Sequence, residues 1–301
     1  MTPNPDFLRS LEIPDLARFE PGAGGLPRLA ISTPLATAHI YLHGAHVAHF
    51  QPTHAAPVLF LSGQSFFKPG KAIRGGVPVC FPWFGPRAGQ PGAPMHGFAR
   101  TMDWEMESLS LNGDQTVLAV LRLAANDETR AHWPHEFVLR HHIAIGHRLT
   151  MLLEVENLSA EPLTFEEALH TYLAVSDARE VAISGLENAP YLDKTDAFQT
   201  KTQPPEPLRF TGETDRVFEN TRATCVLTDP AGDGRRLSVE KSGSATTVIW
   251  NPWAERAAAI ADLAPHAWPS FACIETANAG ANAITLPPGA RQSMRAIIGI
   301  Q

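Results

Sequence analysis

Apolar and polar residues alternate along most of the chain, in short segments separated by proline and glycine. The alternation is clearest in HIYLHGAHVAHFQP (39–52), TVLAVLRLAA (116–125), the long segment 137–175, TTVIW (246–250), SFACIETA (270–277) and AIIGI (296–300). A period of two is typical of half-buried β-strands. A weak helical pattern occurs only in the first 20 residues and in WAERAAAIADL (253–263). The pattern therefore predicts an all-β protein.

Domain organisation follows from the same pattern. The sequence contains no internal repeats, and its Pro/Gly-rich patches at 85–94 and 200–207 are short enough to be loops within one domain. We expect one large antiparallel β-sandwich over residues 26–301, with residues 1–25 as an N-terminal extension packed on or near it. Asn157, Leu158 and Ser159 are expected to form a hairpin loop between two paired strands.

Composition narrows the class of protein. The chain has 301 residues, three cysteines and a formal net charge of -7. It has no apolar run of about 18 residues that could span a membrane, and its N-terminus lacks the pattern of a secretory signal. The acidic balance argues against a broad nucleic-acid-binding surface. We expect a cytoplasmic protein whose anionic ligands, if any, meet a local basic site.

Two short motifs place an arginine beside glycines. Arg74 begins RGG, and Arg100 ends HGFAR, in which His96 precedes a glycine. Glycine permits positive φ and close backbone approach, so both arginines would be presented from tight turns. Two such arginines could hold one dianion. The alternative is that each pairs with a nearby acid or lies in solvent.

Aromatic residues surround these motifs. Phe81 and Trp83 alternate with prolines in PVCFPWFGP (78–86), and Trp250 and Trp253 belong to WNPW. They could fill the core, or they could form a rigid wall against which the C–H face of a sugar packs.

Three residues are candidates for acid–base chemistry or hydroxyl binding. His170 lies on an expected strand, with Glu166 and Tyr172 on its face, and Glu275 lies on another strand among apolar neighbours. An imidazole transfers protons near neutral pH, and burial raises the pKa of a carboxyl toward that of a general base. A lone strand histidine is often only structural. Asp193 follows a strand, where it could accept hydrogen bonds from hydroxyls or simply cap the loop.

Metal and cofactor motifs are not found. His43, His46 and His49 have strand spacing, with His46 on the opposite face, and no acidic residue stands at ligand spacing. No glycine-rich nucleotide-binding motif and no GxSxG is present. The spacing of the histidines therefore gives only weak support for a metal site.

Taken together, six blocks resemble a known family. GKAIRGGVPVCFPWFGP, MHGFARTMDWE, ALHTYLAV, YLDKT, VIWNPW and CIETA stand in the order seen in the hexose-6-phosphate mutarotases (glucose-6-phosphate 1-epimerases) of the aldose 1-epimerase superfamily. The resemblance covers almost the whole chain except its first 20 to 30 residues. It implies a β-supersandwich and a cofactor-free, monomeric enzyme that interconverts the α and β anomers of a hexose 6-phosphate.

The resemblance also implies residue roles. Glu275 would take the proton of the anomeric hydroxyl, while His170 protonates the ring oxygen. His96 would bind near the sugar ring, and Asp193 would hold hydroxyls. The 6-phosphate would be bound by Arg74 and Arg100, with Lys71 and Arg87 as further candidates.

Three other functions remain open from the residues alone. The protein could act on unphosphorylated aldoses such as galactose, it could be a non-catalytic carbohydrate-binding module, or it could be a cupin-like metal enzyme. A role of Arg74 and Arg100 in catalysis on a sugar phosphate would distinguish the main hypothesis from an enzyme of unphosphorylated aldoses. Acceleration of mutarotation above the buffer rate would distinguish it from a binding module.

Overall fold

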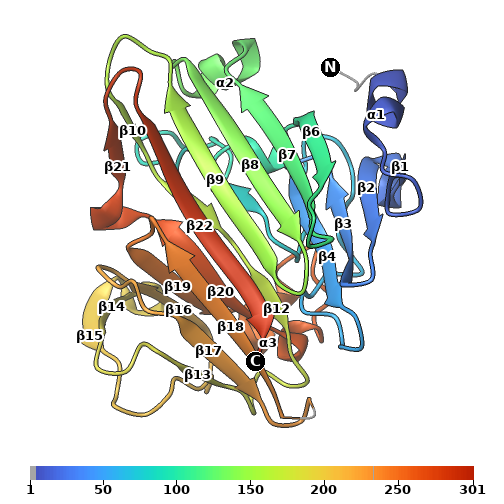
Figure 1. Ribbon diagram of the computed structural model, residues 1–301. Coiled ribbons are helices and arrows are strands. Elements are labelled where there is room, and N and C mark those ends of the chain that lie inside the picture. Colours follow the sequence, from blue (N-terminus) through green and yellow to red (C-terminus); the bar gives the residue numbers. More distant parts are fainter. Residues whose placement is uncertain (1–4, 233) are drawn as a thin grey trace.

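The computed structural model describes residues 5–232 and 234–301, and it is built from two large antiparallel sheets packed face to face (Figure 1). We name each sheet after a central strand. The β22 sheet has eight strands in the order β13 (Ala182–Ser184), β17 (Cys225–Asp229), β18 (Arg235–Ser242), β22 (Arg291–Ile300), β9 (Leu149–Asn157), β8 (Phe137–Ile145), β7 (Val117–Ala124) and β6 (Glu105–Leu111).

The β20 sheet forms the second layer and carries the candidate site. Its order is β15 (Gln199–Thr202), β14 (Pro190–Asp193), β16 (Thr214–Phe218), β19 (Thr246–Asn251), β20 (Phe271–Asn278), β11 (Glu167–Leu169) and β5 (Val79–Cys80), and β12 (Tyr172–Ala174) also pairs with β20. Two short strands, β11 and β12, therefore share one side of a single longer strand.

Smaller elements complete the structure. A four-stranded sheet of β1 (Ala17–Pro21), β2 (Pro27–Ser32), β3 (Ala36–Tyr41) and β4 (His46–Pro52) lies beside the β6 end of the β22 sheet (Figure 1), and β10 (Leu163–Phe165) pairs with β21 (Ile284–Leu286). The α-helices are α1 (Pro5–Leu11), α2 (Asp127–His132) and α3 (Trp253–Ala258). Single 3₁₀ turns are η1 (Ala23–Gly25), η2 (Ala99–Thr101), η3 (Lys194–Asp196), η4 (Trp268–Ser270) and η5 (Gly280–Asn282).

The core lies between the two large sheets, as the period-two pattern predicts. In β9, Leu149, Met151, Leu153 and Val155 are fully buried and alternate with half-buried residues. They belong to the same apolar cluster as Ile274 of β20. Burying such a side chain contributes about 1.5–3 kcal/mol each, which fixes the register of each strand.

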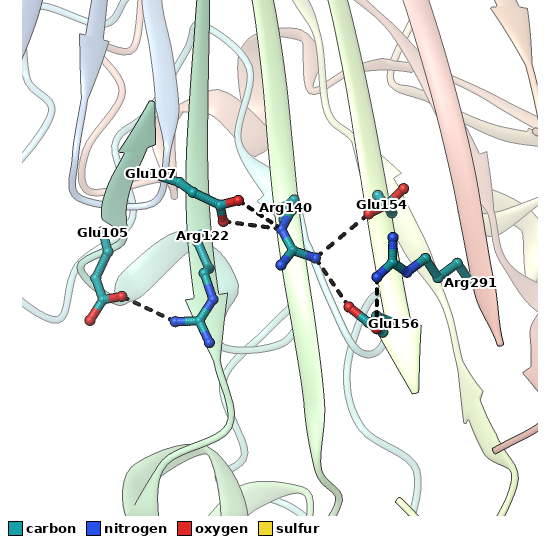
Figure 2. Close-up of polar contacts among 7 residues, drawn as sticks. All are labelled: Glu105, Glu107, Arg122, Arg140, Glu154, Glu156 and Arg291. Carbon is teal, nitrogen blue, oxygen red and sulfur yellow. Dashed lines mark hydrogen bonds and ion pairs between the residues drawn. The ribbon is translucent and has the colours of Figure 1, made fainter. Parts of the chain in front are cut away.

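The outer face of the β22 sheet carries a row of paired charges near the ends of its strands. Arg140 of β8 is at its centre and contacts Glu107 at 3.0 Å and Glu156 at 3.1 Å, and Arg291 binds Glu156 from β22 (Figure 2). Cross-strand pairs of opposite charge favour this alignment of strands.

β20 is an exception to the alternation, because all eight of its residues are buried. Ala272 and Ile274 face the core between the sheets. Phe271 and Cys273 belong to a separate apolar cluster with Tyr172 on the opposite face. Glu275 shares the parity of Phe271 and Cys273, so its side chain is placed on that second face.

The all-β expectation is confirmed, helices α1 and α3 lie in the two segments with a weak helical pattern, and two local predictions were wrong. The helix α2 was missed, although Asn126 and Thr129 form a capping box at its start. Helix α1 is shorter than the helical pattern, because it ends at Leu11 and β1 begins at Ala17. The segment Asn157–Ser159 joins no hairpin, because β9 pairs with β8 and β22 whereas β10 pairs with β21. The boundary proposed at residue 25 stays a prediction.

Candidate active site

Strand register places His170 opposite Glu275. Leu169 at the end of β11 faces Thr276, and Tyr172 at the start of β12 faces Cys273. The two pairings share one register, so of the two residues between the short strands His170 lies across from Glu275 and Thr171 across from Ile274. Directly opposite residues point to the same face of a sheet. His170 itself lies in the gap between two strands, and not within one strand as the sequence predicts.

The two side chains are in contact and almost completely buried. His170 Nε2 lies 3.3 Å from Glu275 Oε1, and their side chains are 8% and 1% exposed. Burial lowers the pKa of His170 well below its ordinary value, and Arg100, Arg74 and Lys194 lower it further. Burial raises the pKa of Glu275 well above its ordinary value, and Asp215 adds to this. Both groups therefore favour their uncharged forms, a protonated Glu275 beside a neutral His170.

Aromatic rings fix the imidazole. The ring of Tyr172 stacks on His170 with centroids 4.8 Å apart and an interplanar angle of 13°. The ring of Trp250 packs edge-on against the rings of His170 and Tyr172, with centroid distances of 5.8 Å and 5.9 Å. Glu166, expected beside His170, instead accepts hydrogen bonds from the backbone N–H groups of Phe84 and Gly280.

Arg74 reaches this aromatic group from the loop before β5. Its Nη1 donates to Tyr172 Oη at 3.0 Å, and its Nε donates to Asp262 Oδ1 at 3.0 Å. Its backbone N–H is held by Ser65 Oγ. Tyr172 and Asp262 raise the pKa of Arg74, so the guanidinium keeps its charge. The glycine pair that follows has positive φ, as expected from the sequence.

The HGFAR segment supplies His96 and Arg100. His96 has a φ of 62°, and its Nδ1 accepts the backbone N–H of Gly85 at 3.2 Å. Burial, Arg100 and His170 lower the pKa of His96 well below its ordinary value, so its single proton is on Nε2. The His96 and His170 ring centroids are 5.8 Å apart. Arg100 donates from Nη2 to the carbonyl oxygen of Met95.

Several buried polar atoms in this cluster have no hydrogen-bond partner among the described residues. They are His170 Nδ1, Glu275 Oε2 and Arg100 Nε. A buried polar atom without a partner costs about 1–3 kcal/mol, so each of the three is a candidate to bind a polar group of a ligand.

One further charged pair completes the cluster, and the sequence did not single it out. Lys194 Nζ lies 2.9 Å from Asp215 Oδ2 and 5.6 Å from the ring centre of Phe84, which packs on His96. Asp193 makes different contacts. Its Oδ1 accepts from Thr195 and its Oδ2 from Lys201, and these bonds keep its pKa low although burial opposes them.

The remaining candidates lie outside the cluster. Lys71 is exposed, and its carbonyl oxygen contacts His43. Arg87 lies over the ring of Trp83 and donates to the carbonyl oxygen of His132 in α2. Phe81 is fully buried in the core. Of the aromatic residues proposed as a wall, Trp250 is the one that contacts His170.

Other features of the described residues bear on possible ligands. They contain no group of three or more His, Cys, Asp and Glu residues arranged to hold a metal ion. A separate pocket of about 650 Å³ between α1 and β1–β3 is lined by Arg9, Arg28, His39 and others, and it shares no lining residue with the cluster. None of the helices in the described residues is long and apolar enough to span a membrane.

Comparison with known proteins now adds to this geometry. The sequence model of the family "Aldose 1-epimerase" matches residues 27–298. A protein of Escherichia coli (strain K12) is 35% identical over 254 residues, which are 84% of each chain, and one of Cenchrus ciliaris is 34% identical over 84% of this chain and 78% of its own. Both bear the name "Putative glucose-6-phosphate 1-epimerase".

Solved structures agree with the sequence comparison. The crystal structure of a "putative mutarotase (YeaD)" from Salmonella typhimurium has a TM-score of 0.89 at 29% identity, and the match covers 96% of this chain and 95% of that one. A galactose mutarotase related enzyme from Lactobacillus acidophilus shares the fold. Its TM-score is 0.73 at 15% identity, and the match covers 91% of this chain and 97% of that one. The β-sandwich, the His170–Glu275 pair and the family match lead to one conclusion: the chain is an isomerase that belongs to the aldose 1-epimerase family.

Proposed function

We propose that the protein interconverts the α and β anomers of a hexose 6-phosphate such as glucose 6-phosphate. The observation that carries the proposal is the buried His170–Glu275 contact of 3.3 Å, with Arg74 and Arg100 close enough to lower the pKa of His170. An acid–base pair suits ring opening, and two cations suit a phosphate dianion. The names of the relatives from Escherichia coli and Cenchrus ciliaris support the same substrate.

Ring opening needs one proton removed and one added. Burial favours protonated Glu275 and neutral His170, so a proton first passes from Glu275 to His170 when the substrate binds. The Glu275 carboxylate then takes the proton of the anomeric hydroxyl O1, the C1–O5 bond breaks, and the His170 imidazolium gives its proton to O5. The sugar becomes an open-chain aldehyde with the same number of protons. Glu275 is then protonated and His170 is neutral, which is the charge state that burial of the pair favours.

Ring closure reverses the roles. Rotation about C1–C2 turns the other face of the aldehyde toward O5. His170 takes the proton from O5, O5 attacks C1, and Glu275 returns its proton to O1. The protein regains its starting state, and the opposite anomer is released.

The neighbouring groups would hold the substrate. Arg74 and Arg100 would bind the 6-phosphate, and the Nε2–H of His96 would donate to the sugar near its ring. Asp193 stays the proposed hydroxyl-binding residue, and we add Asp215 as a second one because it lies close enough to raise the pKa of Glu275; each carboxylate is also paired with a lysine, Lys201 and Lys194 respectively. Binding at the phosphate positions the reacting carbon.

NMR exchange measurements on freshly dissolved α-glucose 6-phosphate test the proposal. We expect acceleration above the buffer rate, and His170→Asn and Glu275→Gln should each lower kcat by about 10²–10⁴-fold. The control His39→Asn changes a half-buried histidine of the small sheet and should have no effect. An absence of acceleration would indicate a binding module. A higher kcat/KM for glucose than for glucose 6-phosphate would indicate a mutarotase of unphosphorylated aldoses.

A further inference from the structure

Tyr172 contacts both the proposed phosphate site and the proposed acid–base pair. Its hydroxyl accepts a hydrogen bond from Arg74 Nη1 at 3.0 Å. Its ring stacks on the imidazole of His170 at 4.8 Å and 13°. One rigid side chain therefore links a cation that would hold the phosphate to the histidine that would protonate the ring oxygen.

The surroundings of Tyr172 leave its ring little freedom. The residue is 1% exposed and packs against Phe271 at 5.2 Å and Trp250 at 5.9 Å. Its backbone N–H donates to Gly76, two residues beyond Arg74 in the same loop, and its carbonyl oxygen accepts from Phe60. Closely packed side chains transmit small displacements. A shift of the Arg74 guanidinium would therefore move the Tyr172 ring, and through it the stacked His170 ring.

The charges of Arg74 and Arg100 also link the proposed phosphate site to His170. Arg74 and Arg100 both hold the pKa of His170 down, which opposes the imidazolium needed for ring opening. A dianion bound at these two cations would offset their charge and favour the protonated imidazole. Asp262 already offsets part of the charge of Arg74 through its bond to Nε, and Arg100 Nε has no partner among the described residues.

We propose that Tyr172 is a positioning residue that couples anion binding at Arg74 to the geometry of His170, so that a dianion activates the ring-opening pair even when it is not attached to the sugar. The proposal rests on the proposed function and deepens it. The phosphate of the substrate then acts as an activator of the reaction and is more than an anchor. Sulfate, which has the charge and shape of a phosphate dianion, should replace it in part.

The test uses D-xylose, an aldopentose that lacks C6 and its phosphate. Its mutarotation is measured with the full chain in sodium sulfate and in sodium chloride of equal ionic strength, since sulfate is too weak a base to catalyse the reaction itself. We expect sulfate to raise the rate about tenfold and saturably, as the contribution of one charged hydrogen bond would. Tyr172→Phe keeps the stacked ring, removes the hydroxyl, and should abolish most of this activation.

A matched control is Tyr41→Phe. Tyr41 is also buried, and its hydroxyl accepts a hydrogen bond from the backbone of Ala23, away from the cluster. This variant should keep the sulfate activation. Equal activation of Tyr172→Phe and the unmodified protein would overturn the proposal, and so would a lack of any sulfate effect in a protein that accelerates glucose 6-phosphate mutarotation.

A second measurement does not depend on turnover. The imidazole ¹⁵N resonances of His170, identified by their loss in His170→Asn, are followed during a sulfate titration. We expect a saturable shift in the unmodified protein and a much smaller one in Tyr172→Phe. No shift in the unmodified protein would overturn the coupling. A shift without acceleration of glucose 6-phosphate would support the coupling and refute the proposed function.

Discussion

Gly97, between His96 and Phe98 of HGFAR, is the position at which one methyl group should disturb the site most. Its φ is +75°, and a Cβ built on it would lie 1.9 Å from the carbonyl oxygen of Phe81 and 2.7 Å from the nitrogen of Pro82. The obstacle is backbone, which a rotamer change cannot remove. Gly97→Ala therefore forces the segment that carries His96 and Arg100 away from Phe81 and Pro82, which follow β5.

The cost has two parts. A left-handed conformation costs an alanine about 1–2 kcal/mol. The overlap with Phe81 must be relieved by a backbone shift, and overpacking of this kind typically costs about 1–3 kcal/mol. Together they give about 2–5 kcal/mol, a large part of the about 5–15 kcal/mol by which a domain is stable. The shift should also raise KM for the sugar phosphate.

Urea unfolding measures the first effect, and Gly113→Ala is the control. A Cβ at Gly113 meets nothing within 4 Å, and its φ lies outside the left-handed region. We expect the control to change the free energy of unfolding by less than about 1 kcal/mol. If Gly97→Ala lowers the free energy of unfolding no more than Gly113→Ala does, the steric argument is refuted.

Three other outcomes follow from the structure. Arg100→Ala should raise KM for glucose 6-phosphate about 10–100-fold and leave KM for glucose almost unchanged; an equal rise in KM for both sugars would contradict phosphate binding. Burial raises the pKa of Glu167 from 4.5 to about 8, so the unfolded chain binds fewer protons than the folded one between these values and stability falls as pH rises through that window. Glu167→Gln should therefore stabilise the protein more at pH 8 than at pH 5 in urea unfolding; an equal effect at both pH values would exclude this account. Arg140→Met should cost about 1 kcal/mol at low salt and less in 1 M NaCl, and a salt-independent loss would assign it to packing.

The sequence pattern predicted the sheets well, because strands with one face in the core must alternate. It failed at α2, whose six residues include one that is buried, so no apolar stripe marks it. His170 was placed on a strand, although the strand is interrupted there, because alternation continues across a gap whose register does not change.

Contacts within the site were harder to foresee. Arg74 and Asp262 are 188 positions apart, and Arg74 and Tyr172 are 98 apart. Alternation and spacing carry no information about such pairs. Asp215 and Lys194 resemble ordinary surface charges in the sequence, and only folding brings them beside Glu275. The family resemblance supplied the residue roles, and local patterns did not.

The shared register of β11 and β12 on β20 has a consequence for redesign. The acid–base pair is set by a ladder of backbone hydrogen bonds, whereas Arg74 and Asp262 come from loops and Arg100 from the 3₁₀ turn η2. The placement of the acid–base pair and the choice of substrate are thus encoded in different parts of the chain. Exchanged loops that suit a carboxylate or an uncharged sugar would leave His170 opposite Glu275 on the sheet, but they would also have to replace the contact that Arg74 makes with Tyr172.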